Sequence, residues 1–167
     1  MKKMTEKALQ EAFAGESMAH MKYLIFSEEA EKKGYKNLAR LFKAIAYAEF
    51  VHARNHAKEI GIVGDVVENI KAAIEGETFE VEEMYPAYNA IAELQGEEGA
   101  KKSIHYAVEA EKIHAEMYRK AEEMAKQGKD VEIKEIYVCP VCGYTHEGEP
   151  PANCPVCGAP KETFVKF

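Results

Sequence analysis

The sequence predicts a mainly helical protein, a four-helix bundle followed by a small β-rich module. Four segments separated by glycines repeat apolar residues at the spacing of an amphipathic helix. Beyond residue 130 the apolar period falls to two residues, as in a strand, and all four cysteines lie there. We therefore expect a bundle over residues 1–130 and a second module over residues 131–167. The second module is too short to fold without a metal or disulfides.

Glycines and capping residues set the expected boundaries. The predicted helices span residues 5–33, 37–60, 65–95 and 97–127. Asn37 is expected to cap the second helix, and Asp65 with Glu68 forms a capping-box pattern at the third. Pro86 lies within the third helix and predicts a kink there. Residues 131–136 alternate apolar and polar side chains, which predicts a strand.

Composition and charge exclude several classes of partner. The 167 residues carry a net charge of −7 with acids along the whole chain, which argues against a nucleic-acid surface. No apolar run approaches the ~20 residues needed to cross a bilayer, and the N-terminal segment does not resemble a signal peptide. We expect a cytoplasmic protein without nucleic-acid or membrane partners, whose cysteines are not paired in disulfides.

Four glutamates share the apolar faces of the predicted helices: Glu16, Glu49, Glu77 and Glu111. A buried carboxylate without a partner costs several kcal/mol and normally takes up a proton instead. Four of them in the middle of helices need a common cation. A pair of metal ions would supply that charge.

Two histidines complete a metal-ligand pattern. Glu49 with His52 and Glu111 with His114 form Glu-x-x-His pairs, whose members share one helix face. One glutamate from each of two helices plus Glu-x-x-His from each of two others is a di-iron carboxylate ligand set. The alternative is a charged bundle with chance matches, and two phased pairs argue against it. Packing or hydrogen bonding is expected for the other histidines near these positions, His20, His56 and His105.

The cysteines form two nearly identical knuckles. Cys139-Pro-Val-Cys142-Gly and Cys154-Pro-Val-Cys157-Gly are paired Cys-x-x-Cys motifs, which predict a tetrahedral four-sulfur metal site. The spacing does not choose between iron and a structural zinc. The small core under this site is expected to contain the tail's aromatic residues, Tyr137, Tyr144, Phe164 and Phe167.

Both metal-site patterns, in this order, resemble the rubrerythrin family over essentially the whole chain. The most specific matching pieces are Ala14-Gly15-Glu16-Ser17, both Glu-x-x-His pairs, Gly76-Glu77-x-x-Glu80, Met84-Tyr85-Pro86 and the two knuckles. The resemblance implies a ferritin-like di-iron bundle that reduces hydrogen peroxide to water and protects against oxidative stress. It also implies a rubredoxin-like domain that takes electrons from a reduced carrier protein or reductase.

The resemblance implies a ligand set of two irons, linked by oxo and carboxylate bridges. Glu49 and Glu111 would bridge the irons, Glu16 would bind one of them, and Glu77 with His114 would bind the other. One further iron, for which zinc could substitute, would be held by the four thiolates of Cys139, Cys142, Cys154 and Cys157.

Four residues have implied roles in turnover. Glu80 matches a carboxylate that one iron exchanges for a histidine on reduction, and His52 matches that histidine. Tyr23 and Tyr85 match tyrosines that hydrogen-bond near the site.

Two other functions share some of these features. A ferroxidase or iron-handling protein would need the bundle and not the tail, and a non-enzymatic metal-binding protein would carry zinc on the cysteines.

The short link between the second and third helices suggests a homodimer, or a larger homo-oligomer, that exchanges helices. In ferritin-like bundles these two helices run parallel and a long crossover joins them. Here the chain would have to climb roughly 34 Å to return to its own bundle, whereas residues 61–65 reach only about 17 Å. We expect helices one and two of one chain to pair with helices three and four of its partner. The alternative is that residues 62–75 form no helix and serve as the crossover.

Overall fold

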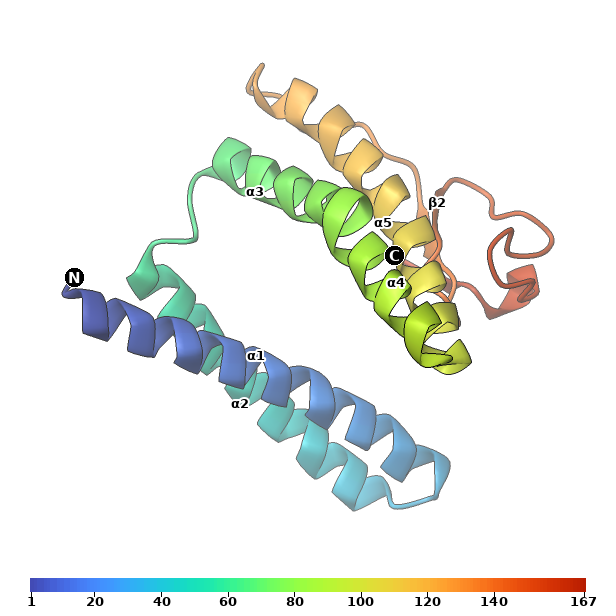
Figure 1. The fold of residues 1–167 in the computed structure, drawn as a ribbon, viewed down its shortest axis with the longest axis horizontal. Helices are drawn as coiled ribbons and strands as arrows, with labels where there is room; N and C mark the ends of the chain where they lie inside the picture. The colour runs from blue at the N-terminus through green and yellow to red at the C-terminus, as the bar shows by residue number, and fades with distance from the viewer. The chain divides into compact units, whose positions relative to one another are not determined.

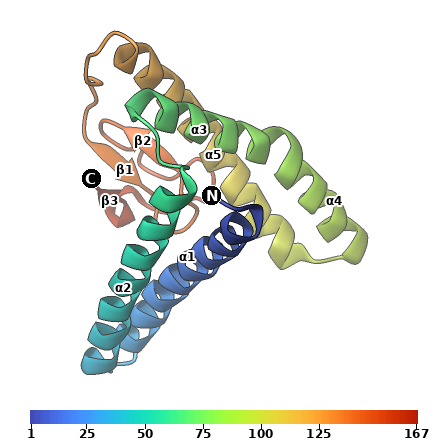
Figure 2. The ribbon, with the colours of Figure 1, turned by 90° about the vertical axis from the view of Figure 1, so that its left-hand side faces the viewer.

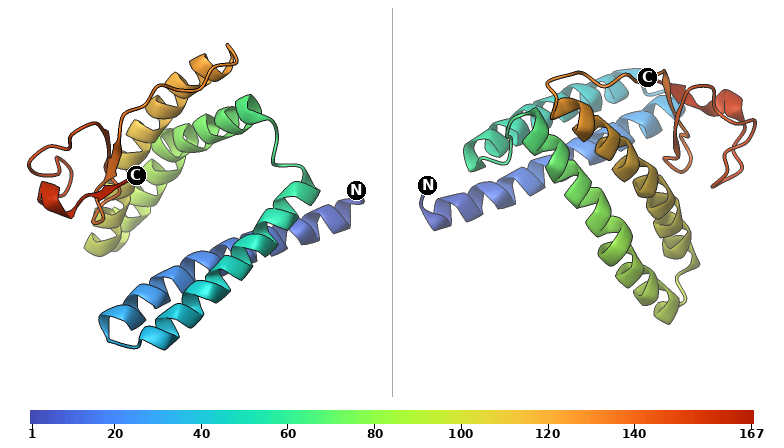
Figure 3. Two further views of the ribbon diagram at one scale, coloured as in Figure 1. Left: turned by 180° about the vertical axis from the view of Figure 1, so that it is seen from behind. Right: turned by 90° about the horizontal axis from the view of Figure 1, so that it is seen from above.

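The computed structural model describes residues 1–167 and contains two compact units, Met1–Gly64 and Asp65–Phe167. The first unit is a hairpin of α1 (Lys3–Lys32) and α2 (Lys36–Ile60), which run antiparallel side by side (Figure 1 and Figure 3). The unit boundary falls inside the predicted bundle, so the proposed division at residue 130 stays a prediction.

Small residues hold the α1–α2 hairpin together. Gly34 adopts a left-handed conformation with φ of 81° at the turn, which a side chain would disfavour. Two side chains of α1 also bond to α2 carbonyls: His20 Nδ1 lies 2.7 Å from the Ala46 oxygen, and Ser27 Oγ donates to the Ala39 oxygen. His20 therefore has a hydrogen-bonding role, as predicted. Buried alanines at seven-residue spacing on α2 let the backbones approach, namely Ala39, Ala46 and Ala53.

The second unit contains α3 (Val66–Phe79), a π-helical segment (Glu80–Met84), α4 (Tyr85–Gln95) and α5 (Glu98–Ala125). The single helix predicted over residues 65–95 is therefore interrupted. Tyr85 N–H donates to the Glu80 carbonyl, the five-residue step of a π-helix. Pro86 follows in the first turn of α4, where its missing N–H is tolerated. The structure thus places the irregularity before the proline.

One of the two helix-capping predictions is confirmed and the other is wrong. Glu68 N–H donates to Asp65 Oδ1 at 2.9 Å and Asp65 N–H donates to Glu68 Oε2 at 2.8 Å, so the predicted capping box is confirmed. The alternative in which residues 62–75 form a crossover is wrong, because α3 begins at Val66. The prediction for Asn37 is also wrong: α2 begins at Lys36, and no side chain caps it.

The tail forms a three-stranded antiparallel sheet of order β2-β1-β3 (Figure 2). Its strands are β1 (Ile136–Val138), β2 (Thr145–Glu147) and β3 (Val165–Lys166), and a 3₁₀ turn covers Lys161–Thr163. The strand predicted over residues 131–136 is wrong except for its last residue, because no strand pairs with residues 131–135.

The core of the tail is built around its cysteines. Cys139, Cys142 and Cys154 are buried, and Tyr144 and Phe164 pack against them as expected. Two of the four predicted core aromatics do not belong to this cluster. Phe167 is 75% exposed, and Tyr137 is half-buried with its hydroxyl bonded to Glu135.

None of the helices carries an apolar stretch long enough to traverse a bilayer.

Candidate metal centres

Each unit carries half of the predicted carboxylate site. In the first unit, Glu16 of α1 and Glu49 with His52 of α2 bring their ligand atoms within 4.8 Å of one another. His52 Nδ1 lies 3.1 Å from Glu49 Oε2 and 3.8 Å from Glu16 Oε1. A hydrogen bond between the two carboxyls raises the pKa of Glu16 and lowers the pKa of Glu49. The two carboxyls thus lie close enough to repel when both are charged, which a bound cation would relieve.

The second unit brings together Glu77 of α3 with Glu111 and His114 of α5 in the same way. Burial raises the pKa of Glu77 to about 8, and a hydrogen bond to Glu111 and the charges of Glu111 and Glu80 add to the effect. A carboxyl that keeps its proton near neutral pH indicates a site with more negative charge than it can hold alone. Such crowding is what a bound cation relieves.

Glu80 and Tyr85 lie beside this second group. Glu80 is in the π-helical segment, outside the three converging ligands, and burial followed by the Glu111 charge raises the pKa of its carboxyl. Burial and the charges of Glu80, Glu111 and Glu77 raise the pKa of Tyr85, so its phenol keeps its proton. The π-helical segment holds Glu80 near the ligands and leads directly into Tyr85.

Tyr23 has a different setting from Tyr85. Its ring lies 6.2 Å from the ring of Phe42 and 6.3 Å from that of Phe26, between centroids. It forms no hydrogen bond with Glu16 or Glu49 within the chain. The structure therefore places Tyr23 in the aromatic packing of the hairpin, and its role near the metals stays a prediction.

The ligand atoms of His114 fit a cation. Nδ1 lies 2.6 Å from Glu111 Oε2, and Nε2 lies 2.8 Å from Thr145 Oγ1. The Thr145 hydroxyl donates its only proton to the Gly143 carbonyl, so it accepts from His114 Nε2–H. In neutral His114, Nδ1 is then a lone pair that faces a carboxylate oxygen. Two acceptors at this distance need a cation to join them: a proton does so in the metal-free chain, and a metal ion bound by both atoms would replace it.

Thr145 was not among the residues predicted from the sequence. It is the residue after Tyr144 in the first knuckle, and it is 7% exposed, the only polar residue in the buried set. No sequence motif marks it, because its partner His114 lies far away in the chain and on a helix.

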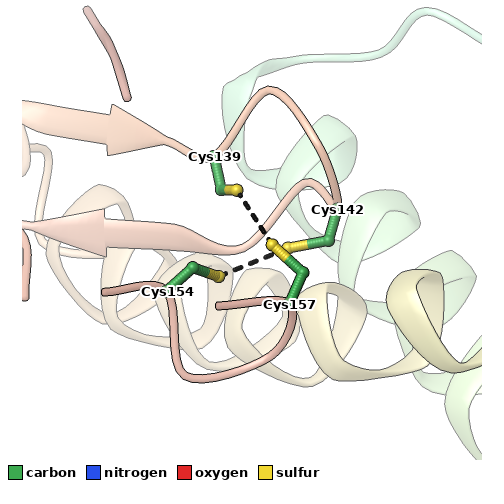
Figure 4. A group of neighbouring side chains, drawn as sticks. All are labelled: Cys139, Cys142, Cys154 and Cys157. Carbon is green, nitrogen blue, oxygen red and sulfur yellow. Dashed lines mark hydrogen bonds between the residues drawn. The ribbon is translucent and has the colours of Figure 1, made fainter. Parts of the chain in front are cut away.

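The four cysteines converge as the knuckle motifs predict. Sγ of Cys139 lies 3.5 Å from Sγ of Cys157, and Sγ of Cys142 lies 3.5 Å from Sγ of Cys154 (Figure 4). A tetrahedral site with metal–sulfur bonds of about 2.3 Å needs sulfurs about 3.8 Å apart, so the group fits one metal ion. All four cysteines are free thiols.

Each knuckle bends its backbone around this group. Gly143 and Gly158 take left-handed conformations, and their N–H groups donate to the carbonyls of Cys139 and Cys154. Burial opposes ionisation of Cys154, but hydrogen bonds from the backbone of Cys157 and Val156 bring its pKa down to about 7. Backbone donors aimed at sulfur favour the thiolate that binds metal.

Family models match both parts of the chain. A model described as Rubrerythrin covers residues 7–122, and one described as Rubrerythrin, rubredoxin-like domain covers residues 137–165. The chain belongs to the rubrerythrin family. Rubrerythrin-2 of Clostridium acetobutylicum is 44% identical, with 98% of this chain and 97% of the relative covered. Nigerythrin of Nitratidesulfovibrio vulgaris is 34% identical over 98% of this chain and 86% of its own.

Solved structures agree with this assignment. Nigerythrin in its partially reduced state and in its fully reduced, all-ferrous state each give a TM-score of 0.58 at 32% identity, over 98% of this chain and 86% of theirs. The predicted fold class and cofactors are confirmed: this rubrerythrin is an oxidoreductase with a di-iron carboxylate site and a four-cysteine, rubredoxin-like site. The exchange of helices between subunits stays a prediction.

The raised pKa of Glu77 predicts an unusual pH dependence for the metal-free protein. Between about pH 4.5 and 8 the folded state keeps a proton that the unfolded state has lost, so rising pH favours unfolding. The free energy of unfolding should therefore fall over this interval. Glu77→Gln should flatten the dependence, because an amide does not titrate.

Urea unfolding of the chelator-treated protein at successive pH values measures this effect. Glu75→Gln is the matched control, because it removes an exposed carboxyl from the same helix. A slope in the Glu77→Gln protein equal to that of the parent would contradict the prediction.

Proposed function

We propose that this rubrerythrin is a peroxidase that reduces hydrogen peroxide to water and protects the cytoplasm against oxidative stress. Electrons would enter at the four-cysteine site from a reduced carrier protein or reductase. The observation that carries the proposal is that α5 contacts the cysteine site and also carries candidate ligands of the carboxylate site. Tyr106 of α5 packs against the cysteine cluster, and Glu111 and His114 follow on the same helix.

The reaction needs two electrons and two protons for each peroxide, and it yields two waters. The two groups of glutamates and histidines would hold a pair of ferrous ions, whose chemistry would be to supply both electrons together and to stabilise the leaving oxygen. The chain's own residues hold protons next to the ligands. Burial and the neighbouring carboxylates raise the pKa of the Tyr85 phenol, so it keeps its proton beside the candidate ligands. Tyr85 is therefore suited to donate a hydrogen bond or a proton to a departing oxygen.

The two histidines differ in a way that supports ligand exchange. His114 is held through both ring nitrogens, whereas His52 is held through Nδ1 alone and its side chain is 52% exposed. His52 is therefore held by fewer bonds within the chain than His114, which suits the proposed exchange with Glu80. Nigerythrin has been solved in mixed-valent and all-ferrous states, so this fold accommodates iron in more than one oxidation state.

Rapid mixing tests the proposal. When the protein is fully reduced without oxygen and mixed with peroxide, the di-iron site should oxidise first. The visible absorption of the ferric four-cysteine site should appear afterwards, because its electron passes on to the bundle. A protein with zinc on the cysteines is the control. It should oxidise once and then stop.

The opposite order of oxidation, or no oxidation, would disprove the peroxidase assignment. A protein that, purified with care for its metals, holds only zinc on the cysteines would disprove the electron route. Oxidation by dioxygen with retention of added iron would favour the iron-handling function instead.

Glu80 has a separate test. Glu80→Ala should keep its metals, because the bridging carboxylates remain, and should slow peroxide turnover by about 10- to 100-fold. Iron content and steady-state rate measure the two effects. Glu83→Ala, an exposed change in the same π-helical segment, should leave both unchanged. Full activity in the Glu80→Ala protein would contradict the exchange role.

We also propose that complete di-iron sites form between two chains. From Glu49 to the end of α2 is roughly 16 Å, and from the start of α3 to Glu77 is roughly 16 Å. A single chain would need to climb roughly 33 Å between Ile60 and Val66, which are at most about 20 Å apart when the link is extended. Glu16, Glu49 and His52 would come from one subunit and the remaining ligands from the other.

Exposed apolar residues on the first unit support this pairing. Large side chains of α1 and α2 remain uncovered on the hairpin: Ile25, Phe26, Leu38, Leu41, Ile45 and Phe50. A hairpin of two helices needs a further pair to bury such a face. A second copy of the chain offers that pair.

Mixing two defective chains tests the exchange. Glu49→Ala and Glu111→Ala should each abolish the di-iron site, because each carboxylate would bridge both irons. A mixed dimer of the two should regain one intact site, made from the unaltered half of each chain. Its iron content and activity should reach roughly half of the parent's.

The matched control combines Glu16→Ala with Glu49→Ala, whose lesions fall on the same half. That mixed dimer should regain nothing, because each site keeps one defective half. Dimers isolated through two different affinity tags make the comparison clean. Failure of the first mixture to regain iron would overturn the exchange.

A further inference from the structure

One stripe of α5 receives the rubredoxin-like tail. Tyr106 packs against the cysteine cluster, and a Cβ built on Gly143 would lie 3.6 Å from the Ala110 side chain. One turn further, His114 Nε2 bonds to Thr145. These three α5 residues recur every four positions and therefore share a face. The tail thus packs against the helix that carries Glu111. The last of these contacts is with His114, a proposed metal ligand.

Thr145 is held firmly within the tail. It stands opposite Val138 in the β1–β2 register, next to Cys139, and its hydroxyl donates to the carbonyl of Gly143 at 3.0 Å. The hydroxyl position is therefore set by the knuckle that carries Cys139 and Cys142. A cavity of about 340 Å³ beside it is lined mainly by apolar side chains, among them Met117, Ala121 and Val131. Few other groups there compete for the His114 hydrogen bond.

We propose that Thr145 is a positioning residue for the di-iron centre, which holds His114 in the Nε2–H tautomer with Nδ1 directed at the metal. Because the hydroxyl gives its proton to Gly143, it can only accept from the imidazole. Rotation of the imidazole ring by a half-turn would break this hydrogen bond and leave Nε2–H and the Thr145 oxygen unpaired. The folded tail therefore orients a ligand of the bundle, apart from any transfer of electrons.

The expected size of the effect follows from other metal sites. Groups that bond to the far nitrogen of a metal-bound histidine typically contribute about 10- to 100-fold in metal affinity. Thr145→Val keeps the shape of the side chain and its β-branching but removes the acceptor. Thr145→Ser keeps the hydroxyl. The proposal rests on the di-iron site of the family and does not require peroxidase activity.

The first test reads the tautomer directly. The full chain is prepared with zinc on the cysteines and no metal in the carboxylate site, and its histidines are labelled with ¹⁵N. Long-range ¹H–¹⁵N spectra at a pH where the ring is neutral should show His114 with its proton on Nε2. Thr145→Ser should keep this pattern and Thr145→Val should lose it. A proton on Nδ1 in the parent protein would overturn the proposal whatever the variants do.

The second test measures Co²⁺ binding to the carboxylate site of the same zinc-containing protein. Thr145→Val should weaken binding by about 10- to 100-fold, and Thr145→Ser should restore most of the loss. Thr163→Val is the matched control, because it removes a hydroxyl bond to the Pro160 carbonyl in an exposed turn of the tail. Unchanged affinity in Thr145→Val, or equal losses in Thr145→Val and Thr163→Val, would contradict the proposal. Should Thr145→Val release zinc, the tautomer of the parent and Thr145→Ser proteins still decides.

Discussion

The structure depends on glutamate carboxylates that converge on the apolar faces of its helices. Cations, either metal ions or protons, must balance their negative charge. Glu77 and Glu111 approach closely enough to share a hydrogen bond, and burial raises the pKa of Glu77 to about 8. An ordinary bundle would place apolar residues at these positions and gain stability. The sequence instead keeps acids on the helix faces that should be buried. Metal binding therefore completes the fold as well as the chemistry, and protons substitute for it when metal is absent.

α5 links this charge cluster to the tail. Its successive turns carry Tyr106 under the cysteines, Ala110 against the knuckle backbone, and Glu111 with His114 at the carboxylate group. Tyr106, Ala110 and His114 share one face of the helix, so the tail that packs along this face also contacts a proposed ligand. A tail that only delivered electrons could be joined to the bundle by a flexible linker, without contacts to the helices. Here it contacts the helix that positions two ligands.

The sequence predicts what depends on neighbours in the chain and misses what depends on distant ones. The Asp65–Glu68 box and the Cys-x-x-Cys knuckles are local patterns, and both appear as expected. Nothing local distinguishes a π-helical turn at residues 80–84 from a kink at Pro86, because both leave one backbone bond unmade. Residues 131–135 alternate as a strand would, but no partner strand pairs with them. Thr145 gains its role only when folding brings it to His114.

The two helical hairpins carry similar groups of candidate ligands, but the groups differ in detail. Glu16 and Glu77 occupy matching places, but three residues later the first hairpin has Ala19 and the second has Glu80. The histidines also diverge, because His52 lies exposed with one bond and His114 is held at both nitrogens. A symmetric site would bind both metals alike. In the site proposed above, Glu80 of the second unit and His52 of the first are the two ligands that one iron would exchange when its oxidation state changes.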